Sequence, residues 1–331
     1  MSTSPLTIAL CYQTQPHHVR QIEALVPNAR VIDAGQEGIA EAILDADIYF
    51  GHAKVPIPWN QVVEQGRLKW IQSSAAGMDH CLVPEVIGSD ILVSSASGVF
   101  ANQVAEQTLA LLLGLIRSLP IFFRQQQRKE YIRRPTGDLH GKTVGIVGLG
   151  GNGRRIAEVL KSFQTRILAT DLFPYDQPQS VDELWPADKL QQLLNNSDIV
   201  VLALPLNSET YHLFDQTRFD EMRDGAIFIN VARGQVVKEA DLVFAVQSGK
   251  LSAIGIDVAE IEPLPEESPL WEMENAIITP HVGAQSASRN DDATDLFCEN
   301  LKHYLRSEPL INLVDKKLGF PKRSRPIKGK S

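Results

Sequence analysis

Three residues far apart in the sequence have side chains suited to acid–base chemistry on a small anion. Arg233 ends an apolar run, Glu262 lies in a proline-rich loop, and His281 follows another apolar run. An arginine can hold a carboxylate by two parallel hydrogen bonds, and a histidine can transfer a proton near neutral pH. Taken singly, each has a commoner role: a surface ion pair, an ordinary loop acid or a structural histidine. The chemistry therefore depends on the elements that position these residues.

Apolar runs in the second half of the chain predict the strands that carry them. The ends of such strands hold the candidate ligand-binding residues, because open parallel sheets bind ligands beyond the carboxyl ends of their strands. Helical segments at 217–223 and 238–248 separate the runs, as expected for a parallel sheet covered on both faces. The predicted strands are Asp198–Pro205, Ala226–Arg233, Ala253–Val258 and Ala276–His281.

A glycine turn precedes these strands. Gly148, Gly150 and Gly153 have the G-x-G-x-x-G spacing, after the apolar run 144–147 and before a helix that reaches about Ser162. The first glycine allows the tight turn, the second lets a pyrophosphate approach the backbone, and the third lets helix pack on strand. The start of the helix offers unpaired N–H groups to the phosphates. Gly151 and Asn152 complete the turn.

An acid at the end of the next strand indicates which dinucleotide is favoured. Asp171 ends the run 166–170, 18 residues after Gly153, where a carboxylate accepts hydrogen bonds from the ribose hydroxyls. The carboxylate repels a 2′-phosphate, so NAD is favoured over NADP. Arg154 and Arg155 at the helix start keep NADP as an alternative.

The first third of the chain has the same alternation of strands and helices. The run Ser73–Asp79 follows a strand and consists mostly of small residues, so its backbone N–H groups form either an anion-binding nest or a plain turn. The apolar segment 102–117 predicts a buried helix with Asn102 as its N-cap, and 122–134 predicts a more polar helix. The expected strands are Thr7–Cys11, Ala29–Ala34, Asp47–Gly51, Leu68–Ala75 and Ile91–Ala96.

Composition excludes several classes of function. The chain has 331 residues and a net charge of −8, which argues against nucleic acid or an anionic membrane as the main partner. The three cysteines form no disulfide framework and no C-x-x-C metal pair, so we expect no metal and a cytoplasmic setting. No signal peptide or membrane-spanning run is apparent. The basic segment 316–331 predicts a flexible tail.

Taken in order, these motifs resemble the D-isomer-specific 2-hydroxyacid dehydrogenases. The resemblance runs from about Leu68 to Ser288. It implies an α/β fold with a Rossmann-type NAD-binding domain (102–286) inserted into a flavodoxin-like substrate domain (1–101 and 287–331). It also implies a homodimer that interconverts a small 2-oxo acid and a D-2-hydroxy acid. Glyoxylate or hydroxypyruvate is the expected substrate, with a larger 2-oxo acid or phosphite as alternatives.

The resemblance assigns roles by position. Arg233 would bind the substrate carboxylate or carbonyl, His281 would be the general acid, and Glu262 would orient His281 and keep it charged for reduction. A dry cleft between two closing lobes would hold the reactants. The backbone of Ala75, Ala76 and Gly77 would receive the substrate carboxylate. The cofactor would be contacted by the glycine turn with Asp171, and by Leu204, Pro205, Val231, Ala232 and Asp257.

The sequence departs from the family's pattern at two places, and two other classes of function remain alternatives. Asn152 replaces the usual apolar residue of the turn, and His52, Lys54 and His80 match no known specificity pattern. His52 and Lys54 either add positive charge for a second anionic group or form a plain exposed loop. Glu262 argues against formate dehydrogenase, and from the short C-terminus we expect no room for the regulatory domain of many phosphoglycerate dehydrogenases. An NAD(H)-sensing corepressor that binds peptides and an idle Rossmann scaffold remain alternatives to an enzyme.

Overall fold

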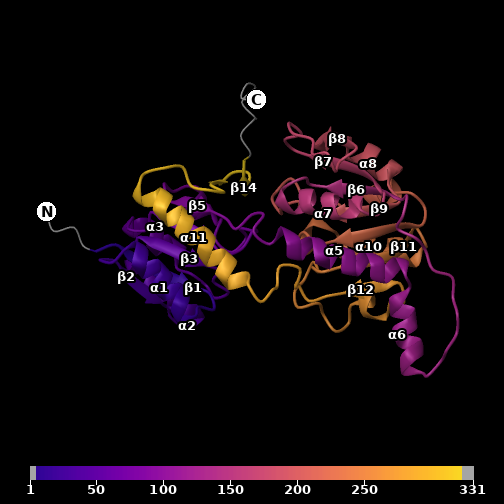
Figure 1. The fold of residues 1–331 in the computed structure, drawn as a ribbon, viewed down its shortest axis with the longest axis horizontal. Helices are drawn as coiled ribbons and strands as arrows, with labels where there is room; N and C mark the ends of the chain where they lie inside the picture. The colour runs from indigo at the N-terminus through magenta and orange to yellow at the C-terminus, as the bar shows by residue number, and fades with distance from the viewer. Residues whose placement is uncertain (1–4, 323–331) are drawn as a thin grey trace. The chain divides into compact units, whose positions relative to one another are not determined.

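The computed structural model describes residues 5–322, which form two compact α/β units (Figure 1). One unit contains the described residues up to Val99 together with those from Ser286 onward, and the other is Phe100–Gln285. The second unit is therefore inserted into the sequence of the first. This arrangement confirms the expected fold class, a Rossmann-type unit inserted into a flavodoxin-like one.

The first unit is built on a five-stranded parallel sheet in the order β2-β1-β3-β4-β5. This order reverses direction between β1 and β3, the point where flavodoxin-like sheets open a crevice at their carboxyl edge. Most of the strand residues are buried because helices cover the sheet. The strands are β1 (Thr7–Cys11), β2 (Arg30–Asp33), β3 (Ile48–Gly51), β4 (Trp70–Ser73) and β5 (Leu92–Ser94); the helices are α1 (Pro16–Leu25), α2 (Gly35–Ala42), α3 (Trp59–Gln65), α4 (Pro84–Ile87) and α11 (Arg289–Leu305).

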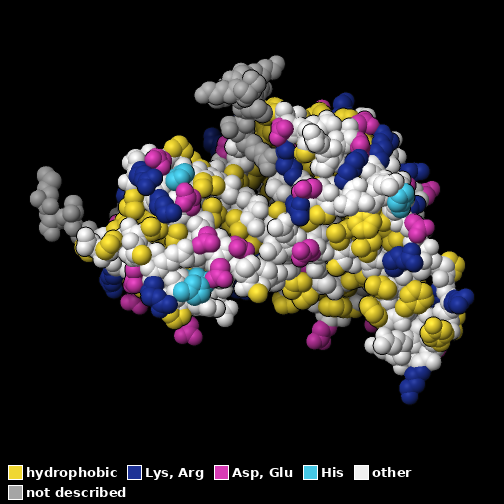
Figure 2. Space-filling model, viewed as in Figure 1, with side chains coloured by type: hydrophobic (Ala, Val, Ile, Leu, Met, Phe, Trp, Pro, Cys, Tyr) yellow, Lys and Arg dark blue, Asp and Glu magenta, His cyan; other side chains and the backbone are white. Residues whose placement is uncertain are grey.

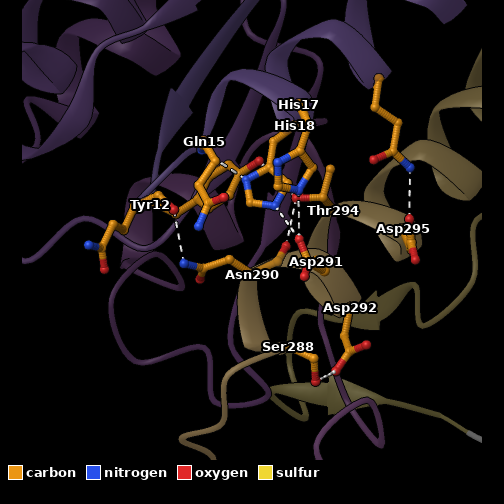
Figure 3. Close-up of polar contacts among 12 residues, drawn as sticks. Tyr12, Gln15, His17, His18, Ser288, Asn290, Asp291, Asp292, Thr294 and Asp295 are labelled. Carbon is orange, nitrogen blue, oxygen red and sulfur yellow. Dashed lines mark hydrogen bonds and ion pairs between the residues drawn. The ribbon is translucent and has the colours of Figure 1, made fainter.

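Helix α1 and the first turn of α11 are joined by two histidines on one carboxylate (Figure 3). His17 Nε2 lies 2.8 Å and His18 Nε2 lies 2.7 Å from the same oxygen of Asp291. The other ring nitrogen of His18 accepts the backbone N–H of Gln15 at 3.0 Å and so caps α1. The junction connects the N-terminal part of the chain to the helix that follows the inserted unit.

The second unit contains a seven-stranded parallel sheet in the order β12-β11-β10-β9-β6-β7-β8, which reverses direction between β6 and β9. Helices lie on both faces of it (Figure 1). The strands are β6 (Thr143–Val147), β7 (Arg166–Asp171), β8 (Glu183–Pro186), β9 (Ile199–Leu202), β10 (Ala226–Asn230), β11 (Leu251–Ile256) and β12 (Ala276–Ile278); the helices are α5 (Ala101–Ile116), α6 (Leu119–Gln127), α7 (Gly151–Lys161), α8 (Leu190–Asn196), α9 (Gln216–Asp220) and α10 (Glu239–Gln247).

Two helix boundaries differ from the sequence prediction. Helix α5 begins at Ala101 with Phe100 as its N-cap, so Asn102 lies inside the first turn and caps nothing. Phe100 is buried. Helix α6 ends at Gln127 rather than near residue 134, because Lys129 adopts a left-handed backbone (φ 59°) that a helix cannot continue.

Part of the segment that was expected to be a flexible tail belongs to the fold. Strands β13 (Val314–Asp315) and β14 (Phe320–Pro321) form an antiparallel pair. Between them, the Lys316 ammonium donates to three backbone carbonyls of the first unit, among them those of Val86 and Ile91. This anchoring makes residues up to 322 part of the fold; the rest of the predicted tail, 323–331, lies outside the described residues.

The charged side chains, the cysteines and the helix lengths can now be compared with the composition. Figure 2 shows acidic and basic side chains interspersed over the visible face. Cys11, Cys81 and Cys298 are buried free thiols, and burial raises the pKa of Cys11 and of Cys298 to about 11. Between residues 5 and 322 no single helix is long and apolar enough to cross a membrane, although α5 and α6, bent by 68°, pass that test as a pair.

Candidate active site

The glycine turn has the geometry that each glycine was expected to provide. Gly148 has φ 94°, and a Cβ there would lie 2.8 Å from the carbonyl oxygen of Ala203. A Cβ on Gly153 would lie 2.1 Å from the carbonyl oxygen of Gly148, so α7 can pack on β6 only without a side chain at this point. A Cβ on Gly150 would meet nothing within 4 Å. The backbone before α7 is therefore open to a ligand, with Gly151 and Asn152 in the first turn.

Asp171 at the end of β7 lies beside this turn. One carboxylate oxygen accepts the N–H of Leu149 and the other that of Phe173, both at 2.8 Å. These bonds fix the carboxylate at the mouth of the turn and leave lone pairs on both oxygens for further donors. The two arginines that kept NADP open have protein partners: Arg154 pairs with Asp176 at 3.0 Å, and Arg155 pairs with Glu158 at 2.6 Å.

The remaining expected cofactor contacts follow the next strands. Leu204 and Pro205 come after β9, which neighbours β6 at the point where the sheet order reverses, and Leu204 passes the glycine turn so closely that its Cα is 2.9 Å from a Cβ built on Gly148. Val231 and Ala232 come after β10. Both segments thus leave the carboxyl edge of the sheet, the edge at which such sheets bind nucleotides.

The turn after β10 positions Arg233. Asn230 is buried, and its side chain accepts the N–H of Ala232 at 3.0 Å and donates to the carbonyl of Arg233 at 3.1 Å. A Cβ on Gly234 would lie 1.8 Å from the carbonyl oxygen of Ala259, so this turn packs directly on the segment after β11. Sequence reasoning did not give Asn230 this role; its signal is a short amide at a strand end, three residues before the arginine.

His281 and Glu262 form a hydrogen-bonded pair. His281 Nδ1 lies 2.9 Å from a carboxylate oxygen of Glu262, and both side chains are partly exposed. Partial burial is the largest single influence on the pKa of Glu262 and acts to raise it. The hydrogen bond and charge of His281, aided by the Ala259 N–H and by Arg233, act in the opposite direction and hold that pKa below its usual value. The carboxylate is therefore ionised near neutral pH, and its pairing leaves His281 Nε2 for a reacting group.

Asp257 holds the loop that carries His281. Its side chain is 3% exposed, and one oxygen accepts Thr279 Oγ1 at 2.6 Å and the N–H of Val282 at 3.0 Å. The other oxygen accepts the N–H of Gly283 at 2.7 Å. His281 itself has φ 54°, a left-handed conformation that these bonds stabilise. Asp257 was expected to contact the cofactor; in this structure its carboxylate bonds to the loop and to Gln107 of α5.

Gln107 and Thr279 are parts of the same arrangement that the sequence did not reveal. Gln107 Nε2 donates to Thr279 Oγ1 at 2.8 Å and lies 3.4 Å from the carboxylate of Asp257. The amide thus ties helix α5 to the loop before His281. Nothing in the spacing of Gln107 distinguishes it from the other polar residues of its helix.

The loop that was expected to bind the substrate carboxylate lies in the first unit, after β4. Ser73 Oγ accepts the N–H of Ala75 at 3.0 Å, so this donor is already used within the loop. Within residues 5–322, the N–H groups of Ala76 and Gly77 have no hydrogen-bond acceptor. Ala76 and Gly77, both of intermediate burial, therefore offer two N–H groups to a ligand, while that of Ala75 is used within the loop.

Two other features lie apart from this site. Glu260 accepts His212 Nε2 at 2.5 Å and the N–H of Glu239 at 2.8 Å, so this strand-end acid supports helix α10. A cavity of about 500 Å³ in the second unit is lined by Lys142, Asp198 and others at the amino ends of the strands. This is the edge opposite the glycine turn, and no expected site residue lines it.

Comparison with protein families identifies the second unit. Residues 109–283 match the family model for the NAD-binding domain of D-isomer-specific 2-hydroxyacid dehydrogenases. The matched segment contains the glycine turn, Asp171, Arg233 and Glu262, and ends two residues after His281. NAD binding, expected from the turn, is confirmed at the level of the family.

Relatives that cover three quarters or more of the chain belong to the same family or carry a related name. A glyoxylate reductase of Pyrococcus horikoshii is 34% identical over 263 residues, covering 76% of this chain and 78% of that protein. A crystal structure of a D-isomer-specific 2-hydroxyacid dehydrogenase family protein from Aeromonas salmonicida superposes with a TM-score of 0.82 at 32% identity, covering 95% of this chain and 100% of the other. A relative from Xanthobacter autotrophicus, solved with NADPH and MES, gives a TM-score of 0.80 at 27% identity, covering 94% and 99%.

Proposed function

The chain belongs to the D-isomer-specific 2-hydroxyacid dehydrogenases, and we propose that it reduces a small 2-oxo acid, such as glyoxylate or hydroxypyruvate, with NADH. The observation that carries this proposal is the hydrogen bond between His281 and Glu262 at the carboxyl edge of the Rossmann sheet. A general acid needs a proton at an atom that can reach the substrate and a partner that stabilises its charged form. His281 Nε2 and the Glu262 carboxylate meet these two requirements.

The reaction adds a hydride to the carbonyl carbon and a proton to the carbonyl oxygen of the substrate. The dinucleotide, when bound, supplies a hydride to the carbonyl carbon. His281 Nε2 gives its proton to the carbonyl oxygen as negative charge develops there, and Glu262 stabilises the imidazolium before transfer. The product is a 2-hydroxy acid, and His281 takes a proton from solvent to restart the cycle.

Arg233 holds the substrate during this transfer. Its guanidinium lies close enough to Glu262 to contribute to the lowered pKa of that carboxylate. A fixed guanidinium binds the carboxylate of the substrate and adds positive charge near the carbonyl oxygen. In the first unit, the N–H groups of Ala76 and Gly77 are donors of the kind that binds a carboxylate, the role that the family resemblance implies for them.

The glycine turn and Asp171 fit a dinucleotide with an unmodified ribose. The open side of Gly150 and the start of α7 would hold the pyrophosphate, and Asp171 would accept the ribose hydroxyls. A 2′-phosphate would be repelled by Asp171, and the nearby Arg154 and Arg155 are already paired with acids. We therefore propose NAD as the preferred cofactor, although the Xanthobacter relative was solved with NADPH.

A substrate screen tests the activity. Oxidation of NADH and of NADPH is measured with glyoxylate, hydroxypyruvate, pyruvate and phenylpyruvate for the wild type, His281→Ala and a control, His140→Ala. His140 is an exposed histidine of the same unit. We expect turnover with NADH, a loss of roughly 100-fold or more in kcat for His281→Ala, and no change for the control. NADH affinity, measured by fluorescence titration, should stay near that of the wild type in both variants.

Each other outcome contradicts a different part of the proposal. NADH binding with no turnover of any 2-oxo acid would favour an NAD(H)-sensing binding protein over an enzyme. Absence of both turnover and NADH binding would overturn the proposal. Full turnover of His281→Ala would remove that residue as the proton donor.

We also propose a homodimer, as the family resemblance implies, in the cytoplasm, as expected from the three cysteines without a disulfide pattern. Helix α6 projects from its unit (Figure 1), and the segment around it exposes Phe123 and Tyr131, which are 58% and 101% accessible, and Ile132. Apolar side chains at this density favour burial against another protein surface. Light scattering after size exclusion measures the mass; a monomer at micromolar concentration would contradict the dimer.

A further inference from the structure

We propose that Asp176 is a second determinant of cofactor specificity, because its carboxylate occupies Arg154, an arginine that would otherwise bind the 2′-phosphate of NADPH. Arg154 lies near the start of α7, and Asp176 lies in the segment that follows β7. The inference rests on the proposed preference for NADH and goes beyond the repulsion already expected from Asp171. It predicts a phosphate site that one ion pair masks and that a single substitution exposes.

Arg154 and Asp171 are bonded to the same residue of the glycine turn. The carbonyl of Leu149 accepts the Nε–H of Arg154 at 3.2 Å, and the N–H of Leu149 donates to the carboxylate of Asp171 at 2.8 Å. The arginine and the acid that would hold the ribose therefore lie on either side of one residue. A 2′-phosphate is an ester of the hydroxyl group that such an acid accepts, so it has to be accommodated beside Asp171, where a nearby arginine can bind it.

Asp176 holds this arginine with both its side chain and its backbone. Nη1 of Arg154 lies 3.0 Å from a carboxylate oxygen of Asp176, and Nη2 donates to the backbone carbonyl of Asp176 at 2.7 Å. With the bond to Leu149, each of the three guanidinium nitrogens has an acceptor. The side chain of Arg154 is 22% exposed and that of Asp176 is 58% exposed. The arginine is thus held against the turn, and a carboxylate at the surface balances its charge.

The segment that carries Asp176 is also anchored by bonds that do not involve its carboxylate. At one end, the N–H of Phe173 donates to Asp171 at 2.8 Å. At the other end, Gln177 Nε2 donates to the carbonyl of Val181 at 2.9 Å. These bonds, and the bond from the arginine to the backbone carbonyl, remain when the carboxylate is removed. A substitution of Asp176 should therefore change the charge beside the turn without unfolding the segment.

Charge explains why this acid can distinguish the two cofactors. NADPH differs from NADH by the phosphate, which would meet the carboxylates of both Asp171 and Asp176 and an arginine whose charge is already paired. Without the carboxylate of Asp176, the guanidinium of Arg154 can offer the phosphate two parallel charge-assisted hydrogen bonds. NADH has no group at that position to gain from the change. Loss of one acid should therefore improve binding of NADPH alone.

A neighbouring ion pair on the same helix provides a matched control. Nη1 of Arg155 lies 2.6 Å from Glu158, and the side chain of Glu158 is 64% exposed, close to the value for Asp176. Glu158→Gln therefore removes the same charge from an arginine one position along the chain. It breaks a pair that lies within α7 and is not bonded to Leu149 or to the segment after β7.

Titrations with both cofactors test the inference. The dissociation constants of NADH and NADPH are measured by fluorescence, and kcat/KM is measured for each with the 2-oxo acid that the wild type reduces best. The variants are Asp176→Asn, Asp176→Ala, Arg154→Met and the double variant Arg154→Met/Asp176→Asn, with Glu158→Gln as the control. Each titration is run at about 0.05 M and about 0.5 M salt, because salt screens exposed charges.

We expect Asp176→Asn and Asp176→Ala to bind NADPH about 10-fold or more tightly than the wild type does, with NADH affinity within about 3-fold. Arg154→Met and the double variant should show no such gain, because they lack the guanidinium. Glu158→Gln should leave both affinities within about 2-fold of the wild type. The gain in the Asp176 variants should shrink at the higher salt concentration.

Failure of this inference differs from failure of the proposed function. An NADPH affinity that both Asp176 variants leave unchanged, a gain that survives in the double variant, or an equal gain in Glu158→Gln would overturn the inference while turnover with NADH persists. A wild type that binds NADPH more tightly than NADH would overturn the proposed cofactor preference and with it this inference. Melting temperatures equal to that of the wild type would show that the changes in affinity do not reflect unfolding.

Discussion

The carboxylate of Asp257 accepts the backbone N–H of Gly283 at 2.7 Å and so closes the loop around His281. A Cβ on Gly283 would lie 2.8 Å from that same carboxylate oxygen, so only glycine allows this approach. The N–H of His281 also donates to the backbone carbonyl of Asp257 at 2.7 Å. One buried acid therefore determines the backbone conformation from which the proposed proton donor projects.

Replacing Asp257 by asparagine should misplace His281 without removing any proposed catalytic group. The amide would turn an N–H₂ toward backbone donors, leaving buried N–H groups unsatisfied at a cost of about 1–3 kcal/mol. We expect a lower melting temperature and a fall in kcat of roughly 10-fold or more. Thermal unfolding and steady-state kinetics measure both, with Asp224→Asn, whose side chain is 93% exposed, as the control. A variant with wild-type kcat would show that the loop does not depend on this carboxylate.

Glu262→Gln should change the pH dependence of both activity and stability. Because the pKa of Glu262 is lowered by folding, its contribution to stability is present above the usual value of 4.5 and is lost as the pH falls through the lower folded value. The difference in melting temperature between wild type and Glu262→Gln should therefore shrink below about pH 4.5. A constant difference across that range would contradict the assigned coupling.

The same substitution should move the rate profile. The neutral amide no longer stabilises a charged imidazole, so reduction by Glu262→Gln should decline at lower pH than in the wild type as the solution becomes alkaline. Rates of NADH oxidation across the pH range measure this. Identical alkaline limbs would indicate that Glu262 orients His281 without affecting its proton transfer.

The strands and the glycine turn were predictable because their patterns are local. Buried parallel strands appear as short runs of branched apolar residues, and Gly148, Gly150 and Gly153 have a spacing dictated by one turn. The family's motifs then gave the positions of Arg233, Glu262 and His281. The structure adds the 2.9 Å contact between the last two, which are separated by a loop whose course no local pattern describes.

Side-chain contacts between distant segments were not predictable. Asn102 has the residue type of a cap, but the helix begins one residue before it, at Ala101, with the buried Phe100 as N-cap. Lys316 was assigned to a solvated tail on composition alone, yet its ammonium finds three carbonyls more than two hundred residues earlier in the chain. For Lys316 these tertiary partners determined the outcome, and the local sequence does not record them.

The histidine pair on Asp291 should not bind a metal, although three ligand atoms meet there (Figure 3). His18 Nδ1 accepts the N–H of Gln15, so the ring proton is on Nε2, the atom that faces Asp291. A metal on Nε2 would move that proton to Nδ1, against the Gln15 N–H, whereas ligating histidines normally donate from their second nitrogen. We expect titration calorimetry with Zn²⁺ to show no stoichiometric binding at this site. Stoichiometric binding in the wild type that is lost in His18→Ala would contradict this tautomer.

Alanine at two glycines of the same turn should separate folding from cofactor binding. Gly150→Ala introduces a methyl group into open space at an ordinary φ of −69°, so we expect a wild-type melting temperature. The methyl group would occupy the approach of the pyrophosphate, so NADH affinity should fall by roughly 10-fold or more. Gly153→Ala instead places a methyl group 2.1 Å from the carbonyl oxygen of Gly148 and should lower the melting temperature by several degrees or more.

Thermal unfolding without cofactor and NADH titration distinguish these effects. If Gly150→Ala bound NADH as tightly as the wild type, the dinucleotide would have to lie elsewhere than above this residue, and the assignment of the turn would be wrong. A Gly153→Ala variant as stable as the wild type would show that α7 can move away from β6 at little cost. The two glycines are only three residues apart. Weaker NADH binding by Gly150→Ala together with lower stability of Gly153→Ala would therefore separate the space needed for binding from the space needed for packing.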